Sequence, residues 1–252
     1  MVAVGMAGRR FELIRPDWPA AARIRACSTT RAGGVSSAPY DGLNLGDRVG
    51  DDAAAVQANR RVLAEQLDIV APVWLEQVHG TRVVDIAAWF DGGADAAITS
   101  EPGCVCAVMT ADCLPILLTD CAGTTVAAVH GGWRGLAAGI VEAATGAFAA
   151  RGIAPDALLA WLGPAIGPAA YEVGPEVADA LDGQDAAALA PGRPGHWQLD
   201  LYALARRRLV GAGVAAIYAA DACTLADPSR FFSYRRDGVC GRQATLVWLD
   251  GG

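Results

Sequence analysis

The feature that most constrains the fold of this chain is a succession of six short apolar segments between residues 73 and 130. They read VWLEQVH, RVVDIA, DAAITS, VCAVMTAD, PILLTD and TTVAAVH, and glycine, proline or aspartate residues bound them. Apolar segments of about six to eight residues between turn-forming residues are typical of β-strands. The most apolar windows, residues 103–118 and 135–150, are interrupted by acidic residues, which argues against a membrane span. This region therefore predicts the core of a β-sheet.

Helical patterns lie around these strands and do not alternate strictly with them. Helices are expected over residues 52–68, 136–151 and 201–211, the last of them capped by Asp200. Because the strands come in clusters, we expect an α+β fold with a mixed β-sheet core flanked by helices. Further strands are expected over residues 23–30, 158–163, 214–221 and 243–250.

Length and charge restrict the domain organisation and the class of partner. A chain of 252 residues with no clear linker is expected to form one catalytic domain over residues 11–252, preceded by a flexible tail at residues 1–10. That tail does not have the pattern of a secretory signal, and seven cysteines do not form a disulfide framework, so we expect a cytoplasmic protein, either a monomer or a small homo-oligomer. A net charge of −7 argues against nucleic-acid or membrane partners and favours a small-molecule ligand.

Only three histidines occur, and two of them end predicted strands. His79 stands in QVHG and His130 in AVHGG, each followed by a glycine that predicts a tight turn. Cys113 occupies an equivalent place, after VCAVMTAD and before a Leu-Pro pair. Because loops at the rim of a sheet commonly carry functional sites, we expect these three side chains to be able to meet there.

Two imidazoles and one thiolate suit a zinc ion. Three protein ligands leave the fourth tetrahedral position open for water or substrate, and ligand atoms that share a zinc ion lie within about 4 Å of one another. The spacing of His79, Cys113 and His130 matches no short metal-binding motif. The pattern is therefore explained equally well by two histidines and a cysteine that only pack in the core.

Two other chemistries use the same residues. A Cys113 thiolate paired with His130 and oriented by a carboxylate would make a cysteine hydrolase. With a more distant methionine such as Met109, the set is also the ligand list of an electron-transfer copper site. A multicopper oxidase needs further histidines for its oxygen-reducing cluster, and only His196 is left for that purpose.

Two arginine-containing segments are candidates for anion binding. GGWRG places Arg134 at the start of a predicted helix, where free N–H groups favour phosphate or carboxylate, although a solvated arginine on a turn explains it equally. FFSYRRDG sets aromatic residues beside Arg235 and Arg236, a combination that can stack a base and bind an anion, or else form the edge of a strand. Asp112, next to Cys113, is expected to orient a metal ligand or to shape the turn.

Taken together, the motifs resemble the YfiH family, also called the laccase-domain or multicopper polyphenol oxidase family. The matching segments include STTRAGGVS, YDGLNLGD, PVWLEQVHG, VCAVMTADCLP, VAAVHGGWRG, AWLGPAIGP and FFSYRRDG. The resemblance implies a YfiH-like fold and identifies His79, Cys113 and His130 as metal ligands, for zinc or alternatively for copper. Members of the family are variously named purine nucleoside phosphorylase and peptidoglycan editing factor.

The resemblance also implies substrates. It points to phosphorolysis of purine nucleosides, namely adenosine, inosine, guanosine and S-methyl-5'-thioadenosine, with adenosine deamination as a second activity. Asn44, Arg134 and Arg235 then become candidates for binding nucleoside or phosphate. The family commonly shows LNLGxHVGD where this chain reads LNLGDRVGD, so Arg48 replaces a histidine. An arginine stays charged near neutral pH, so Arg48 is expected to bind phosphate and not to transfer protons.

The expected mechanism uses zinc to activate water for attack on C6 of adenosine, and arginines to position phosphate for phosphorolysis. No proton donor to the departing purine is assigned; Glu76, Asp95 and Asp112 are near the ligands in sequence. Two alternatives keep the same fold. One is a hydrolase that edits a peptidoglycan precursor, with Cys113 as nucleophile or zinc as activator, and the other is a copper-dependent oxidase of polyphenols.

Overall fold

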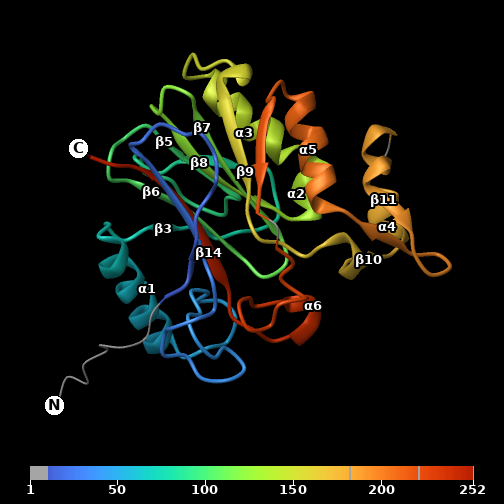
Figure 1. The fold of residues 1–252 in the computed structure, drawn as a ribbon, viewed down its shortest axis with the longest axis horizontal. Coiled ribbons are helices and arrows are strands. Elements are labelled where there is room, and N and C mark those ends of the chain that lie inside the picture. Colours follow the sequence, from blue (N-terminus) through green and yellow to red (C-terminus); the bar gives the residue numbers. More distant parts are fainter. Residues whose placement is uncertain (1–10, 182, 221, 252) are drawn as a thin grey trace.

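The computed structural model describes residues 11–181, 183–220 and 222–251, and the tail expected at residues 1–10 lies outside them. The α+β class expected from the sequence is confirmed. Most strands lie in two large sheets between two layers of helices (Figure 1). On one side lies α1 (Ala53–Leu67), and on the other lie α2 (Trp133–Ala138), α3 (Ile140–Ala149) and α5 (Leu201–Gly211).

The first sheet has five strands and carries α1 on its outer face. All of its neighbouring strands are antiparallel except the last pair, which is parallel. Leu63 and Leu67 of α1 pack against Ala107 and Leu246 of this sheet, and Asp52 caps the helix by accepting the N–H of Ala54. In order across the sheet, the strands are β1 (Leu13–Ile14), β2 (Ile24–Thr29), β14 (Gln243–Leu249), β6 (Val105–Thr110) and β3 (Val73–Trp74).

The second sheet has six strands and carries the other helices. Its two outer pairs are parallel, while the central pairs are antiparallel. In order, the strands are β13 (Ala216–Ala219), β9 (Leu158–Leu162), β7 (Leu114–Asp120), β8 (Val126–Gly131), β5 (Ala96–Thr99) and β4 (Val83–Asp85).

Stacking of the two sheets explains why the central strands are apolar throughout. In β7, Ile116 and Leu118 face the helices of the outer layer, whereas Leu117 faces the first sheet. A strand with both faces buried does not alternate between apolar and polar residues, and for this reason PILLTD reads as one continuous apolar run.

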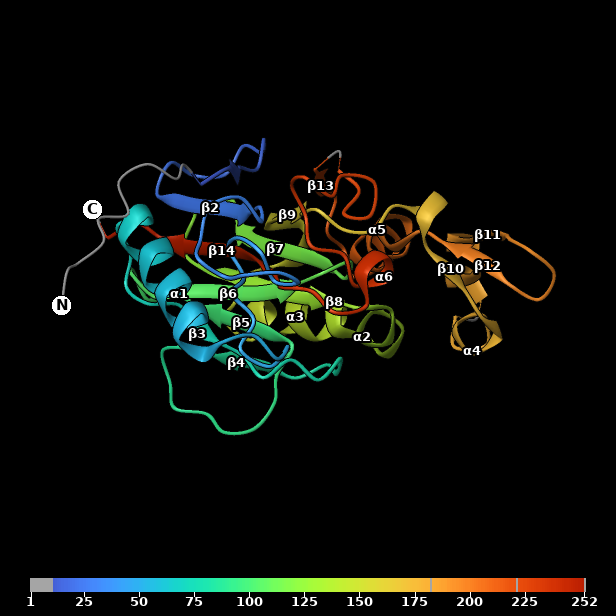
Figure 2. The same ribbon diagram turned by 90° about the horizontal axis from the view of Figure 1, so that it is seen from below.

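A smaller lobe lies to one side of the two sheets (Figures 1 and 2). It contains three short antiparallel strands, β10 (Glu172–Val173), β12 (Trp197–Leu199) and β11 (Leu189–Pro191), with helix α4 (Pro175–Ala178). The remaining elements are 3-10 helices η1 (Pro155–Ala157), η2 (Pro168–Ala170) and η3 (Gly183–Ala188), and helix α6 (Tyr234–Asp237).

Two expected elements take a different form. The helix expected over residues 136–151 is divided between α2 and α3 at Gly139, whose φ of 100° is left-handed and is readily adopted only by glycine. The strand expected over VWLEQVH contains only Val73–Trp74. Beyond it, the N–H groups of Val78, His79 and Gly80 turn to the carboxylate of Asp95.

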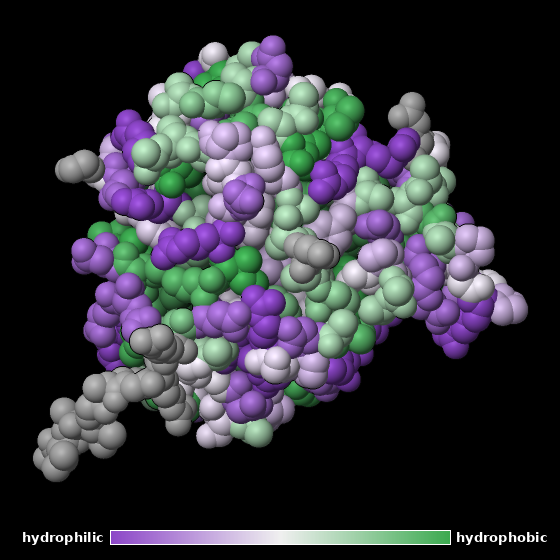
Figure 3. Space-filling view, in the orientation of Figure 1, coloured by the Kyte–Doolittle hydropathy of each residue, from purple (hydrophilic) through white to green (hydrophobic). Residues whose placement is uncertain are grey.

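None of the helices in the described ranges has the length and apolar character needed to cross a membrane. On the face shown in Figure 3, hydrophilic residues lie between the apolar ones.

Candidate metal centre

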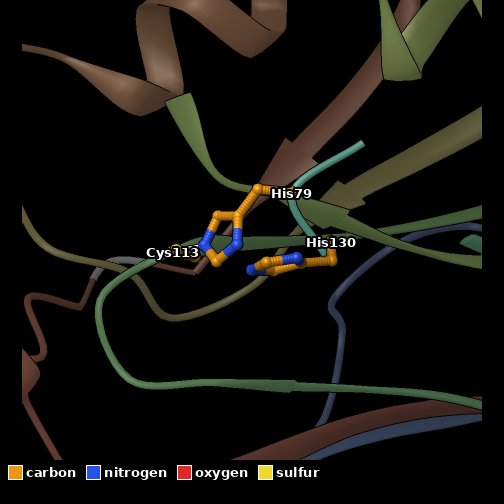
Figure 4. Close-up of side chains that lie close together, drawn as sticks. All are labelled: His79, Cys113 and His130. Carbon is orange, nitrogen blue, oxygen red and sulfur yellow. Dashed lines mark hydrogen bonds between the residues drawn. The ribbon is translucent and has the colours of Figure 1, made fainter. Parts of the chain in front are cut away.

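His79, Cys113 and His130 come together at one end of the stacked sheets. His79 lies in the loop after β3, Cys113 lies between β6 and β7, and His130 is near the end of β8. Their ligand atoms all lie within 4.8 Å of one another, and Cys113 Sγ is 3.8 Å from His79 Nε2. The two imidazole rings lie edge to face, with centroids 4.7 Å apart (Figure 4). Three residues that are distant in sequence therefore form one group that can hold a metal ion.

Unusual backbone geometry places two residues of this region. His79 has φ of 61° and Asp112, immediately before Cys113, has φ of 93°. Side-chain-bearing residues adopt left-handed φ at a cost of about 1–2 kcal/mol, so surrounding contacts must hold both turns. A strained backbone at a cluster of ligands is typical of functional sites.

Gly132 gives the two ligand side chains room to approach. A Cβ atom at this position would lie 2.7 Å from Cδ2 of His79 and 3.3 Å from Sγ of Cys113. At the first distance, the His79 ring would have to move to admit a side chain. The GGWRG turn therefore has a steric role at the centre, in addition to any role in anion binding.

Asp95 supports both histidines through one buried carboxylate. It accepts hydrogen bonds from the backbone N–H groups of Val78, His79 and Gly80 at 2.7–3.2 Å, and it lies 2.8 Å from Nδ1 of His130. Its side chain is fully buried. Because Nδ1 of His130 is occupied by this carboxylate, Nε2 is the atom left to bind a metal.

The charged forms of Cys113, His130 and Asp95 stabilise one another. Burial raises the pKa of Cys113, but the His130 and His79 imidazoles outweigh burial and lower it to about 6. Burial lowers the pKa of His130, but the Cys113 thiolate and the Asp95 carboxylate outweigh it and raise the pKa to about 9. Burial would raise the pKa of Asp95, whereas its hydrogen bonds from His130, Gly80 and His79 lower it overall. Without a metal ion, the group favours a thiolate beside an imidazolium.

The donor set fits a zinc ion with a small adjustment. Zinc bonds of about 2.0–2.3 Å in a tetrahedron place the ligand atoms about 3.3–3.8 Å apart. The 3.8 Å between Cys113 and His79 meets this requirement, whereas the 4.8 Å limit for the whole set exceeds the 4 Å expected from the sequence. The set must therefore contract by about 1 Å around a zinc ion. His79 is exposed, which gives it freedom to move.

A cavity of about 450 Å³ opens onto the centre, and all three candidate ligands line it. Cavities of this size commonly hold small organic ligands. Arg48 pairs with Glu76 at its edge, with the guanidinium largely exposed. Besides the ligands, its lining includes Arg48, Gln77, Met109, Thr110, Tyr234 and Arg242.

Of the expected substrate contacts, Asn44 is placed differently. It is fully buried and does not line the cavity. Its amide donates to Asp51 and to the carbonyl of Gly46, while its Oδ1 accepts the N–H groups of Gly46 and Arg242. These bonds position the loop that carries Arg48, and a contact between Asn44 and substrate stays a prediction.

Arg134 and Arg235 are also outside the lining of this cavity. Arg134 is exposed, and its guanidinium lies over the ring of the neighbouring Trp133 at 4.4 Å. Arg235 lies over the ring of Tyr171 at 4.8 Å and donates to the carbonyl of Glu172 in the small lobe. Burial, and then the Cys113 charge, raise the pKa of Tyr171 to about 12.

Asp112 anchors two distant segments to the turn before Cys113. Its carboxylate accepts the Thr224 hydroxyl and the Arg235 N–H, both at 2.6 Å. Its carbonyl accepts the N–H of Ile166 at 3.0 Å. These contacts favour the turn-shaping role expected for Asp112.

The stacking surface expected in FFSYRRDG does not form from its phenylalanines. Phe231 and Phe232 are fully buried, and Ser233 caps helix α6 in place of the alternative strand edge. Arg236 donates to the carbonyls of Thr224, Leu225 and Phe231 and thus ties this segment together. Only Tyr234 of the aromatic residues reaches the cavity.

Sequence reasoning named Asp95 only as a residue near the ligands and missed its role as their common support. The available signal was a carboxylate at the start of the otherwise apolar segment DAAITS. Such a group is buried only if it is paired or hydrogen-bonded, which predicts a partner but does not identify it.

Known proteins resemble this chain over most of its length. Residues 25–250 match the family model described as multi-copper polyphenol oxidoreductase laccase. A Pseudomonas aeruginosa protein named purine nucleoside phosphorylase is 52% identical over 240 residues, which is 94% of this chain and 98% of that protein. Purine nucleoside phosphorylase YfiH of Escherichia coli K12 is 49% identical over 243 residues, which is 94% of this chain and 99% of that protein.

Solved structures show the same arrangement of elements. A Neisseria meningitidis protein of the DUF152 family has a TM-score of 0.88 at 44% identity, over 95% of this chain and 99% of its own. YlmD from Geobacillus stearothermophilus has a TM-score of 0.88 at 34% identity, over 96% of this chain and 100% of its own. The similarity therefore extends over nearly the full length of each chain.

Proposed function

The chain belongs to the family described as multi-copper polyphenol oxidoreductase laccase, and from this premise we propose that it is a zinc-dependent purine nucleoside phosphorylase that also deaminates adenosine. The observation that carries the proposal is the His79, Cys113 and His130 group in the wall of a cavity large enough for a nucleoside. The names of the relatives support purine nucleosides and phosphate as substrates.

In the proposed phosphorolysis, a phosphate oxygen bonds to C1' of the ribose as the bond from C1' to N9 of the purine breaks. The electron pair of that bond passes to the purine, which leaves as the free base after taking up the proton that hydrogen phosphate loses. Adenosine, inosine, guanosine and S-methyl-5'-thioadenosine all contain this bond. The protein must therefore hold an anion and a purine in the same cavity.

Arginines at the cavity supply the charge for phosphate. Arg48 and Arg242 both line it, and a guanidinium can bind phosphate through two parallel hydrogen bonds. Phosphate would compete with Glu76 for Arg48, an exchange favoured by the exposure of that ion pair. Arg134 and Arg235, which lie outside this lining, remain candidates for binding nucleoside or phosphate.

The metal would be held by Cys113 Sγ and by nitrogen atoms of His79 and His130. When bound, zinc supplies a Lewis acid that polarises a substrate group or lowers the pKa of water. Asp95 keeps His130 in the tautomer that presents Nε2, and Gly132 keeps the approach of the ligands open. Because the cavity is lined from both large sheets, we further propose that residues 11–252 act as one catalytic domain.

The direct test is to incubate the purified zinc-loaded protein with inosine and phosphate and to measure hypoxanthine and ribose 1-phosphate. We expect both products in equal amounts, and inosine with ammonia when adenosine is given without phosphate. Arg48→Gln should raise KM for phosphate with little change in KM for inosine, whereas the exposed helix residue Arg61 gives the matched control Arg61→Gln. If no hypoxanthine forms, the proposal is wrong.

A second candidate is a cysteine hydrolase that edits a peptidoglycan precursor. The specific observation is that Cys113, His130 and Asp95 follow the order of a nucleophile, a base and an orienting carboxylate. Metal removal separates the two proposals: a phosphorylase loses activity with a chelator, whereas a thiolate nucleophile is freed by it. Release of an amino acid from such a precursor by the chelated protein would favour the hydrolase.

Copper chemistry has less support from the contacts. Sδ of Met109 accepts a hydrogen bond from Arg60 at 3.8 Å, and His196 lies on the loop between β11 and β12, bonded to Arg193. No histidine is therefore left near the centre, within the described residues, for an oxygen-reducing cluster. Copper-loaded protein that oxidises phenols, and fails to do so after Cys113→Ser, would nevertheless support this alternative.

A further inference from the structure

Thr110, at the end of β6, has a buried hydroxyl group with no visible partner. The residue is 2% exposed, and in the described part of the chain no group forms a hydrogen bond with its Oγ1. The residue lines the same cavity as the three candidate ligands. Burial of a hydroxyl without a hydrogen bond is costly, and such groups are rare in folded proteins. An unpaired hydroxyl on a residue that lines a cavity is therefore a candidate to bind a ligand.

The direction of the Thr110 side chain follows from the alternation of residues in β6. Cys106 and Val108 pack in the apolar layer between the two sheets, whereas Ala107 and Met109 pack on the side of α1. Because residues two apart face the same side of a strand, Thr110 points into the space between the sheets. His130 of the second sheet enters the cavity from the other side of that space.

Two glutamines fix the end of this strand. The side chain of Gln77 both donates to the carbonyl and accepts from the N–H of Met109, at 2.8 and 2.7 Å. On the other side, Gln243 of β14 pairs directly with Thr110, and its own side chain is bonded to the backbone of Phe232. The backbone that carries the Thr110 side chain is therefore held in place before a ligand binds, which lowers the entropic cost of recognition.

We propose that the Thr110 hydroxyl binds the edge of the purine that carries N1 and the C6 substituent. This inference rests on the proposed function, because deamination at the centre requires C6 to lie beside the candidate ligands, where Thr110 also lies. Adenosine presents an acceptor at N1 and a donor at C6, and inosine presents the reverse. A hydroxyl can donate or accept, so one group serves both bases. Thr110 would thus account for an enzyme that accepts both 6-amino and 6-oxo purines.

The test measures binding separately from turnover. Inosine and adenosine are titrated calorimetrically into the zinc-loaded protein without phosphate, and KM is measured with phosphate present. After the adenosine titration, the recovered ligand is analysed to show whether any of it has been deaminated to inosine. Thr110→Val removes the hydroxyl at nearly constant shape and should raise Kd and KM about tenfold for both nucleosides, the effect of one lost hydrogen bond. Thr110→Ser keeps the hydroxyl and should stay within about threefold of the native protein.

The matched control is Thr119→Val in β7. Thr119 is fully buried, but its hydroxyl donates to the carbonyl of Thr125 at 3.0 Å, away from the cavity. This variant should have a lower Tm and unchanged nucleoside binding. Thr110→Val should instead keep its Tm, because the hydroxyl that it removes has no partner in the protein.

Unchanged Kd values in Thr110→Val would overturn the inference, and a lowered Tm with unchanged binding would show that the hydroxyl serves the fold. If the native protein converts inosine and the Thr110→Val variant binds inosine equally well, only the role of Thr110 is contradicted. Native protein that neither binds nor converts any nucleoside contradicts the proposed function and this inference together.

Discussion

At the scale of single residues, Asp95 decides the geometry of the candidate centre. Its one carboxylate holds the loop of His79 by backbone N–H groups and holds the ring of His130 by Nδ1. Both histidines therefore depend on the same buried charge. Glycine at position 132 supplies the space in which His79 and Cys113 meet.

Asp95→Asn should weaken zinc binding about 10- to 100-fold, because a neutral amide neither stabilises His130 nor accepts all of the same hydrogen bonds. Competition with a chromogenic chelator measures the affinity. Asp85→Asn is the control, since Asp85 pairs with Arg151 at 2.6 Å near the surface. Equal zinc affinities in the two variants would contradict the role given to Asp95.

Cys113 should be the reactive thiol of the zinc-free protein. Its pKa of about 6 is lower than that of an ordinary thiol, so the thiolate predominates above about pH 6 and is protonated as the pH falls through this value. Alkylation by iodoacetamide, followed by peptide mass spectrometry, should therefore show a midpoint near pH 6 at Cys113.

Cys27 provides a comparison within the same protein, because burial raises the pKa of its thiol to about 12. It should remain unmodified in the folded state at neutral pH. His130→Ala should move the midpoint of Cys113 to higher pH, since the imidazolium favours the thiolate. A midpoint that does not move would show that His130 has no such effect.

At the scale of elements, two short helices replace one long helix after the His130 strand. The periodic apolar pattern continues through Gly139, but the left-handed backbone there separates α2 from α3. This break lets α2 begin at the turn against the centre while α3 packs on the second sheet.

Gly139→Ala should lower the free energy of unfolding by about 1–2 kcal/mol, because alanine is strained at a φ of 100°. Gly146→Ala is the matched contrast within α3, where an added Cβ meets no atom within 4 Å. That change should stabilise the protein by about 0.5–1 kcal/mol. Denaturant unfolding measures both, and a stabilised Gly139→Ala would contradict the account of the break.

At the scale of the whole molecule, the candidate ligands come from segments attached to both sheets. His79 follows β3 of the first sheet, His130 belongs to β8 of the second, and Cys113 lies on the connection from β6 to β7. A bound metal would therefore join parts of the fold that are far apart in sequence. Asp112 links the same region to the segments of Thr224 and Arg235.

Zinc should accordingly raise the Tm of the protein. A ligand at a concentration of about a thousand times its Kd stabilises the native state by about 4 kcal/mol. For a chain of this size, that corresponds to a rise in Tm on the order of 10 °C. Thermal unfolding with zinc and with a chelator measures the difference. Cys113→Ala should fold but show no zinc-dependent shift, and a full shift in this variant would exclude Cys113 as a ligand.

Most strands of the two large sheets, the cap of α5 and the three candidate ligands could be predicted from the sequence, because each depends on neighbouring residues. Aspartate before a helix and apolar runs between turn residues act locally, and histidines at strand ends are visible in QVHG and AVHGG. Only the tertiary structure decided that Asp95 supports both histidines and that Asn44 is buried outside the cavity lining. It also left the Thr110 hydroxyl unpaired. Such contacts join residues that are far apart in the chain, and their partners are set by how two sheets stack, which local pattern does not encode.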